Sequence, residues 1–214
     1  MKLAVDARAA PPPRIGVDFD NTLISYDDVF VSYAAAEGIV IGGAARSKRE
    51  VRDAIRALPD GETRWQALQG RVYGKGIVDA VLLDGVSRFI RRCRGAGCDV
   101  VLISHKTEFG HFDPDRVNLR DAAVAWLEDH GLFDERKGLT RDGVYWESTR
   151  EAKIQRIAST GCGLFIDDLE EVLADATFPP AVERILLSNT EPDGADRPFV
   201  TCRSWAEVEK HVFS

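Results

Sequence analysis

Two aspartates separated by one residue, Asp18 and Asp20, follow the apolar run at residues 15–17. The run is typical of a buried strand, so the pair stands where a strand opens into a loop. Alternate residues of an extended segment point to the same side, so the two side chains lie close together. Two ionised carboxylates at such a short distance repel each other. A divalent cation, or a proton kept on one group, relieves the repulsion, which suits metal binding, nucleophilic attack and proton transfer. For this pair alone, a solvated strand end is an equally good interpretation.

Further polar residues stand at comparable places in the chain. Two apolar runs, 100–103 and 164–166, are followed directly by polar residues, and a helical pattern at 150–158 carries a lysine in its first turns. These residues are Ser104, Lys153, Asp167 and Asp168. Ligands of open parallel sheets bind outside the carboxyl ends of the strands. We therefore expect all of these residues to meet Asp18 and Asp20 in one crevice.

Phosphoryl transfer requires positioning and charge neutralisation, and four of these residues can supply them. Asp18 can attack phosphorus and form an aspartyl-phosphate. Asp20 can protonate the leaving oxygen and then take a proton from the hydrolytic water. Ser104 can donate a hydrogen bond to a phosphoryl oxygen, and Lys153 can offset the charge of phosphate and nucleophile together.

The acidic residues can also hold a hard cation such as Mg²⁺. Asp18, Asp167 and the backbone carbonyl of Asp20 offer oxygen ligands, and Asp168 can bind through water or orient a ligand. Each residue alone has an ordinary explanation as a strand end, a helix cap or a solvated charge. Their joint occurrence in this order favours a catalytic site.

The pattern of the whole chain predicts an α/β fold. Short, continuous apolar runs, typical of parallel strands covered on both faces, occur at residues 15–17, 100–103, 144–146, 164–166 and 185–187. Helical patterns lie between them at 85–94, 119–129, 150–158 and 169–175. This alternation indicates a Rossmann-like, doubly wound parallel sheet.

One stretch, residues 25–81, interrupts the alternation. It carries helical patterns at 27–37, 48–57 and 62–69, and no convincing strand. We therefore divide the chain into a core, residues 1–24 and 82–214, and a small helical cap, residues 25–81, inserted after the first strand. Residues 46–75 hold twice as many Lys and Arg as Asp and Glu. A solvated helix face explains this excess, and a lid that attracts an anionic substrate is the alternative.

Composition excludes several classes of protein. The 214 residues are 44% hydrophobic and 29% charged, with a net charge of -7, which argues against a nucleic-acid binder. No apolar run approaches the roughly 18 residues of a membrane span. The first ten residues do not look like a secretion signal. The four cysteines lack Cys-x-x-Cys spacing, so we expect buried thiols and a cytoplasmic protein.

With these motifs in place, the chain resembles the haloacid dehalogenase superfamily of phosphohydrolases over residues 14–188. The resemblance rests on Asp18-Phe19-Asp20-Asn21-Thr22-Leu23, on Ser104, on Lys153 and on Phe165-Ile166-Asp167-Asp168. It implies a Rossmann-like core, a Mg²⁺ cofactor, Asp18 as nucleophile and Asp20 as acid and base. It also implies that Thr22 helps to shape the substrate site. Asn21 replaces the more frequent glycine of the motif.

The resemblance bears on the insertion and on specificity as well. The helical insertion is similar to a type 1 cap, which closes over small substrates. The carboxylate of Asp20 favours a phosphatase over a dehalogenase, because dehalogenation needs no acid for the leaving group. His105, Lys106 and His111 follow Ser104 in a short loop that can contact substrate, and an ordinary polar loop is the alternative.

The function expected from the sequence is a Mg²⁺-dependent phosphatase that hydrolyses a small phosphate monoester. A phosphomutase of the same fold is the first alternative. A nucleic-acid end phosphatase is less compatible with the acidic charge, and a non-catalytic binding protein is less compatible with the complete set of acidic residues. The expected partner is a small phosphorylated metabolite, with no nucleic acid and no membrane.

Overall fold

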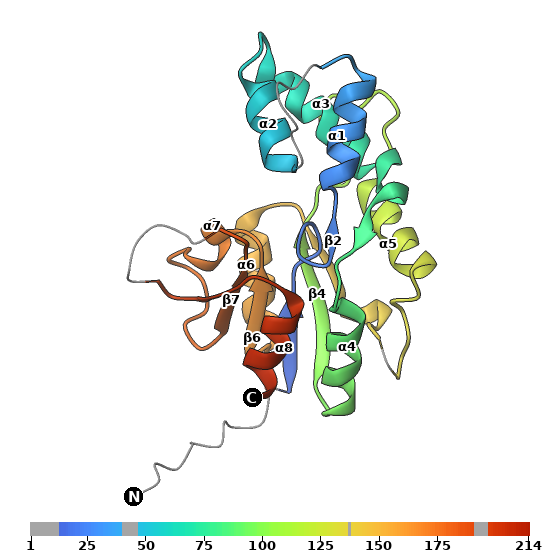
Figure 1. The fold of residues 1–214 in the computed structure, drawn as a ribbon. Helices are drawn as coiled ribbons and strands as arrows, with labels where there is room; N and C mark the ends of the chain where they lie inside the picture. Colours follow the sequence, from blue (N-terminus) through green and yellow to red (C-terminus); the bar gives the residue numbers. More distant parts are fainter. Residues whose placement is uncertain (1–12, 40–46, 137, 191–196) are drawn as a thin grey trace, which may run out of the picture.

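The main sheet of the molecule has six strands. It forms the lower part of the molecule (Figure 1). The computed structural model describes residues 13–39, 47–136, 138–190 and 197–214. In spatial order the strands are β5 (Val144–Glu147), β4 (Asp99–His105), β1 (Arg14–Val17), β6 (Leu164–Asp167), β7 (Glu183–Leu187) and β8 (Val200–Cys202). Each neighbouring pair runs parallel. The five strands expected from apolar runs are confirmed.

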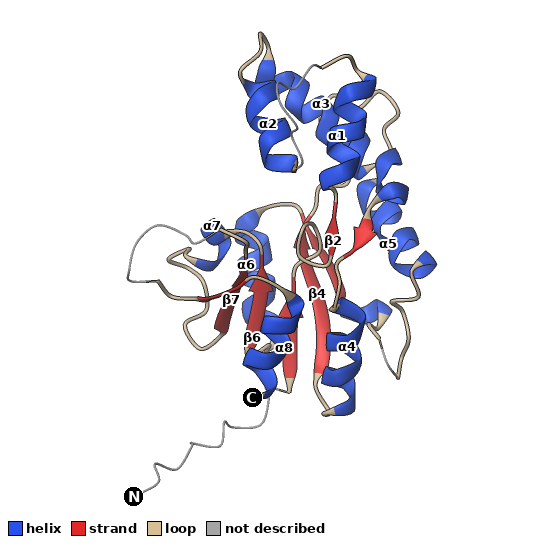
Figure 2. Cartoon of the chain, in the orientation of Figure 1, coloured by secondary structure: helices blue, strands red, loops and turns tan. Residues whose placement is uncertain are grey.

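Helices cover both faces of this sheet (Figure 2). One face shares a hydrophobic cluster with α4 (Val86–Gly95), α5 (Leu119–Asp129) and α8 (Trp205–Phe213), and the other with α6 (Arg150–Thr160) and α7 (Glu170–Leu173). Neighbouring strand residues alternate between the clusters: Ile166 belongs to the first and Phe165 to the second. A Cβ at Gly16 would lie 2.5 Å from the Phe165 ring, so glycine lets that ring lie across β1. The doubly wound α/β prediction is confirmed.

A group of helices stands above the carboxyl ends of the strands (Figure 1). It consists of α1 (Asp27–Ala36), α2 (Lys48–Arg56), α3 (Gly61–Tyr73) and the 3₁₀ helix η1 (Lys75–Asp79), which we call the helical lobe. The three α-helices contact one another, and Phe30 of α1 stacks on Trp65 of α3 with ring centroids 5.0 Å apart. The lobe therefore has apolar packing of its own.

Three short strands were not expected from the sequence. β2 (Ile24–Ser25) and β3 (Val81–Leu82) pair antiparallel and join the two ends of the lobe, so the expectation of no strand within residues 25–81 is wrong at its borders. Two residues are too few to show a period. β8 is an edge strand of three residues, and α7 is shorter than the helix expected at 169–175.

Two other expectations concern the termini and the thiols. Residues 1–10, which were not expected to be a secretion signal, lie outside the described residues. All four cysteines are buried and unpaired. Within the described ranges no helix combines the length and apolarity that crossing a membrane requires.

Candidate active site

Strand register brings the acidic residues of distant segments to one edge of the sheet. Val17 of β1 is level with Ile166 of β6, and the backbone N–H of Asp18 donates to the Ile166 carbonyl at 2.9 Å. Asp18 therefore lies beside Asp167. Carboxylate oxygens of Asp18, Asp167 and Asp168 lie within 4.8 Å of one another. The expected convergence of these three residues is present.

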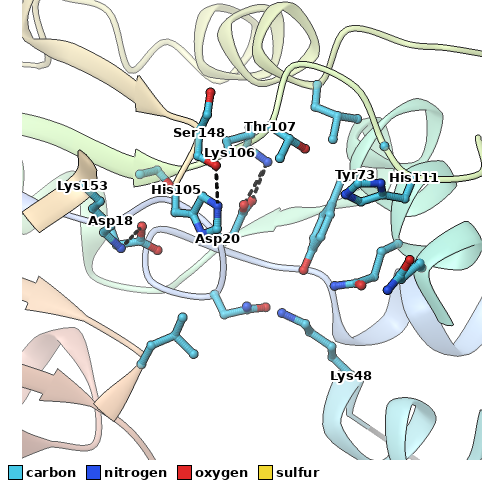
Figure 3. A pocket seen from close by; sticks show the side chains of 18 of the residues that line it. Asp18, Asp20, Lys48, Tyr73, His105, Lys106, Thr107, His111, Ser148 and Lys153 are labelled. Atoms are coloured by element: carbon cyan, nitrogen blue, oxygen red, sulfur yellow. Dashed lines mark hydrogen bonds and ion pairs between the residues drawn. The ribbon is translucent and has the colours of Figure 1, made fainter. Parts of the chain in front are cut away.

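Lys153 is buried between two of these carboxylates. Its Nζ donates to Asp18 Oδ1 at 2.7 Å and to Asp167 Oδ2 at 2.6 Å (Figure 3 shows the first pair). The lysine side chain is 1% exposed. Burial alone would lower its pKa, but Asp167 and Asp18 outweigh burial and raise the pKa, so the ammonium group stays charged.

The acidic cluster has more negative charge than Lys153 can offset. Burial and the neighbouring carboxylate of Asp18 raise the pKa of Asp167, although Lys153 opposes the shift. Burial, Asp167 and Asp18 raise the pKa of Asp168 further. Three crowded carboxylates of this kind are the donor set that a hard divalent cation prefers. The residues present therefore fit a Mg²⁺ ion.

Asp20 has separate partners, although it is only two residues from Asp18. Lys106 Nζ lies 3.0 Å from Asp20 Oδ1 and 2.8 Å from Oδ2, and the Tyr26 hydroxyl donates to Oδ1 at 2.8 Å. β1 ends at Val17, and the backbone φ of +59° at Asn21 turns the chain after Asp20. Asparagine tolerates this left-handed region better than most residues, which accounts for its place in the motif. The Asp20 carboxylate is outside the cluster of three, so only its backbone carbonyl remains a candidate ligand.

Ser104 and Thr22 occupy different depths of the site. Ser104 lies in β4, is buried and lines a cavity of about 480 Å³ together with Asp18 and Lys153. Thr22 is fully buried and does not line this cavity. Its hydroxyl lies 3.4 Å from Asp18 Oδ2 and 3.5 Å from Asp168 Oδ1, so it supports the carboxylates from beneath. Thr22 therefore contacts the acidic cluster, and its expected role in shaping the substrate site stays a prediction.

The end of β4 and the loop after it contribute to the same cavity. His105, Lys106 and His111 all line it. His105 Nε2 lies 3.1 Å from the Ser148 carbonyl oxygen. Lys106 is buried, and its ammonium group lies over the rings of Phe19 and Tyr73 at 5.4 and 4.9 Å. The side chain of Lys106 is thus committed to Asp20.

The helical lobe supplies the opposite wall of the cavity through residues that the sequence analysis did not name. Lys48 of α2 and Gln66, Gln69 and Tyr73 of α3 line it (Figure 3). The three residues of α3 have the spacing i, i+3 and i+7, which places them on one helix face. Polar residues at this spacing, on a helix that also has a buried apolar face, were the sequence signal that could have indicated this wall of the cavity. Tyr26 was also missed, and burial together with Asp20 raises its pKa well above the usual range.

Comparison with solved structures identifies the fold. A hydrolase of the HAD superfamily, subfamily IA, from Geobacter sulfurreducens matches with a TM-score of 0.57 and 12% identity, over 97% of this chain and 100% of that one. The chain has the fold of the haloacid dehalogenase superfamily. A predicted phosphoglycolate phosphatase from Haemophilus somnus matches with a TM-score of 0.56 and 15% identity, over 93% and 97% of the two chains.

A third similar structure carries a different kind of name. Protein Tyrosine Kinase A (PtkA) of Mycobacterium tuberculosis matches with a TM-score of 0.61 and 13% identity, over 96% of this chain and 100% of that one. No protein-family model and no curated protein matches the sequence. The identities are low, so the likeness establishes the fold, and the activity has to be argued from the site.

Proposed function

We propose that the protein is a Mg²⁺-dependent phosphatase that hydrolyses a small phosphate monoester through an aspartyl-phosphate on Asp18. The observation that carries the proposal is the buried Lys153 ammonium group between Asp18 and Asp167, 2.7 and 2.6 Å from their oxygens. A cation at this depth offsets negative charge beside Asp18 and attracts a phosphoryl group to it. Ser104 lines the same cavity. In the proposed mechanism its hydroxyl group donates a hydrogen bond to a phosphoryl oxygen.

The two half-reactions divide between the two motif aspartates. A carboxylate oxygen of Asp18 bonds to phosphorus while the ester oxygen leaves with a proton from Asp20. In the second half, water attacks phosphorus and gives its proton to Asp20, which releases inorganic phosphate and regenerates the Asp18 carboxylate. Lys106 and Tyr26 hold the Asp20 carboxylate in place for both proton transfers.

Asp18, Asp167 and Asp168 would hold the cation, with the Asp20 backbone carbonyl as a further donor. An ion held there would supply positive charge that offsets the negative charge of a phosphoryl group. The pairing of Asp167 with the backbone N–H of Leu169, at 3.0 Å, fixes that carboxylate. These residues orient the site before substrate arrives, which reduces the cost of reorganisation.

In this proposal the helical lobe acts as the type 1 cap, residues 25–81, over the core of residues 1–24 and 82–214. The cavity of about 480 Å³ between lobe and sheet edge suits a small metabolite. A nucleic-acid end would have to enter beneath the lobe. We therefore favour a small phosphorylated metabolite, in the cytoplasm, as substrate.

The test is hydrolysis of p-nitrophenyl phosphate with Mg²⁺, in the wild type and in Asp18→Asn. The variant removes the nucleophile without changing side-chain volume, so we expect turnover to fall by a factor on the order of 10³ or more. Asp115→Asn, in an exposed loop pair with Lys75, is the matched control and should retain activity. Chelation of Mg²⁺ should also abolish turnover. Persistent hydrolysis by Asp18→Asn would exclude the proposed nucleophile, and activity in chelator would exclude the metal.

A further inference from the structure

Lys48 is a cation that the catalytic roles above leave unexplained. It is the first residue of α2, where its backbone N–H donates to Asp27 Oδ1 at 2.7 Å and so ties α2 to α1. Its ammonium group reaches over the rings of Tyr73 and Phe30, 5.5 and 5.9 Å from their centroids. The side chain is partly buried, lines the cavity and lies beside Tyr73 (Figure 3). Lys48 is therefore fixed by the lobe and directed at the site.

The other two lysines of the cavity already have partners. Lys153 is paired with Asp18 and Asp167, and Lys106 with Asp20. Within the described part of the chain Lys48 Nζ is in no ion pair. Burial disfavours its charge, but Tyr73, Asp168 and Asp20 outweigh burial and raise the pKa of Lys48, so the group is cationic at neutral pH. A half-desolvated ammonium group without a paired anion gains more than an exposed one from an anionic ligand.

The position of Lys48 decides which part of a ligand would meet it. Lys153 marks the end of the cavity where phosphorus meets Asp18, and Asp20 marks the departing oxygen. Lys48 lies on the lobe side, where the cavity joins a second one of about 860 Å³ that Asn21 and Asp168 also line. A leaving group that extends from Asp20 toward the lobe therefore passes Lys48.

We propose that Lys48 binds a second anionic group, a carboxylate or a second phosphate, on the leaving group of the substrate. This inference rests on the phosphatase function proposed above and names its substrate class. Gln69 and Tyr73, on the same wall, are neutral hydrogen-bonding groups that suit hydroxyls between the two anionic ends. Lys48 is accordingly a specificity-determining residue.

Two matched pairs of esters test the proposal. 3-Phosphoglycerate differs from glycerol 3-phosphate by a carboxylate in place of a hydroxymethyl group, and fructose 1,6-bisphosphate differs from fructose 6-phosphate by a second phosphate. The readout is the ratio of kcat/KM within each pair, for the wild type, Lys48→Met, Lys48→Gln and Lys48→Arg. Arg64→Met removes the same charge from an exposed position on α3 that lines neither cavity, and is the control.

We expect the wild type to prefer the more anionic ester in at least one pair. Lys48→Met and Lys48→Gln should lower that ratio by a factor on the order of 10 to 100, the usual worth of a charge-assisted hydrogen bond, while Lys48→Arg and Arg64→Met keep it. The pair that responds distinguishes carboxylate from phosphate. An unchanged ratio in Lys48→Met, with equal losses on both esters, would overturn the proposal in favour of a contact with the transferred phosphoryl group. A wild-type preference for the neutral ester in both pairs would also overturn it.

Failure of the phosphatase function has a different signature. In that case no ester, including p-nitrophenyl phosphate, would release phosphate with Mg²⁺. The role of Lys48 is then tested separately, by calorimetric measurement of ligand affinity for the wild type and for Lys48→Met. The ligands are 3-phosphoglycerate, glycerol 3-phosphate and the two fructose phosphates. Selective loss of affinity for the more anionic member of a pair would support the anion site, and equal affinities would exclude it.

Discussion

Replacement of Lys153 by methionine should destabilise the metal-free protein strongly, because it leaves two buried carboxylates without their cation. The side chains of Lys153, Asp18 and Asp167 are 1%, 6% and 0% exposed. Removing one partner of a buried charge pair costs about 3–5 kcal/mol. For a chain of this length, each kcal/mol shifts the melting temperature by about 2–4 °C, so the expected decrease is roughly 6–20 °C.

The loss should depend on pH and on metal. Without the lysine, burial and the neighbouring Asp18 carboxylate raise the pKa of Asp167 in the folded state further above its unfolded value, because Lys153 opposes this shift in the wild type. A group shifted in this direction stabilises the fold at acidic pH and loses that contribution as pH rises through its folded pKa. The variant should therefore be closest to the wild type near about pH 5 and furthest from it near about pH 8. Saturating Mg²⁺ should reduce the difference, because the ion replaces part of the missing positive charge.

Denaturation by urea, in chelator and in Mg²⁺ at both pH values, measures these free energies. Arg156→Met is the matched control, since Arg156 is also on α6 and pairs with Glu147 at 2.6 Å, but its side chain is 41% exposed. Exposed pairs contribute about 0–1 kcal/mol. If Lys153→Met and Arg156→Met had the same unfolding free energy in chelator at the higher pH, the buried ammonium group would not be a structural counter-ion and the reasoning would be refuted.

Three further predictions concern the cluster, the loop and the acid. The raised pKa of Asp168 predicts that the metal-free wild type becomes less stable as the pH rises from about 5 to about 8. Mg²⁺ should therefore raise the melting temperature more at about pH 8 than at about pH 5. Equal increases in melting temperature at the two pH values would contradict this. Gly110→Ala would place a Cβ 2.4 Å from Gly70 Cα, so we expect it to lower the free energy of unfolding, measured in urea, by about 1–3 kcal/mol. Gly95→Ala is the control, because its Cβ would have no atom within 4 Å, and it should leave stability unchanged or raise it. Lys106→Met should slow hydrolysis of alkyl phosphates more than that of p-nitrophenyl phosphate, whose leaving group needs no acid; equal losses in steady-state kinetics would remove Lys106 from the positioning of Asp20.

Most of the core could be predicted from the sequence because parallel strands leave continuous apolar runs. These runs indicated the strands, and the rule that ligands bind at the carboxyl ends of parallel strands then placed Asp18, Ser104 and Asp167 near one another. The order of the strands came only from the structure. The buried position of Lys153 was less accessible, because nothing in a helical pattern distinguishes a lysine that faces the sheet from one that faces solvent.

The lobe side of the site could not be predicted in the same way. Lys48 reaches the cavity only because α2 and α3 pack together above the sheet, and β2 and β3, which hold the lobe, are too short to leave a pattern. Lys106 was noted as a residue near substrate, but its pairing with Asp20 depends on how the chain turns after Val17. Such contacts join segments that are far apart in the chain, and no hydrophobic periodicity of a single sequence indicates which segments will meet.

The partners of the two motif aspartates assign them to different parts of the molecule. Asp18 is held by Lys153 of α6 and lies beside Asp167 of β6, and both elements belong to the α/β core. Asp20 is held by Lys106 and by Tyr26, the residue that joins β2 to α1. Because the Tyr26 ring packs edge-on against Tyr73 of α3, with centroids 4.9 Å apart, the position of the Asp20 carboxylate depends on the seating of the lobe. In the proposed mechanism the nucleophile is therefore positioned by the core alone, whereas the acid is positioned jointly by the core and by the lobe.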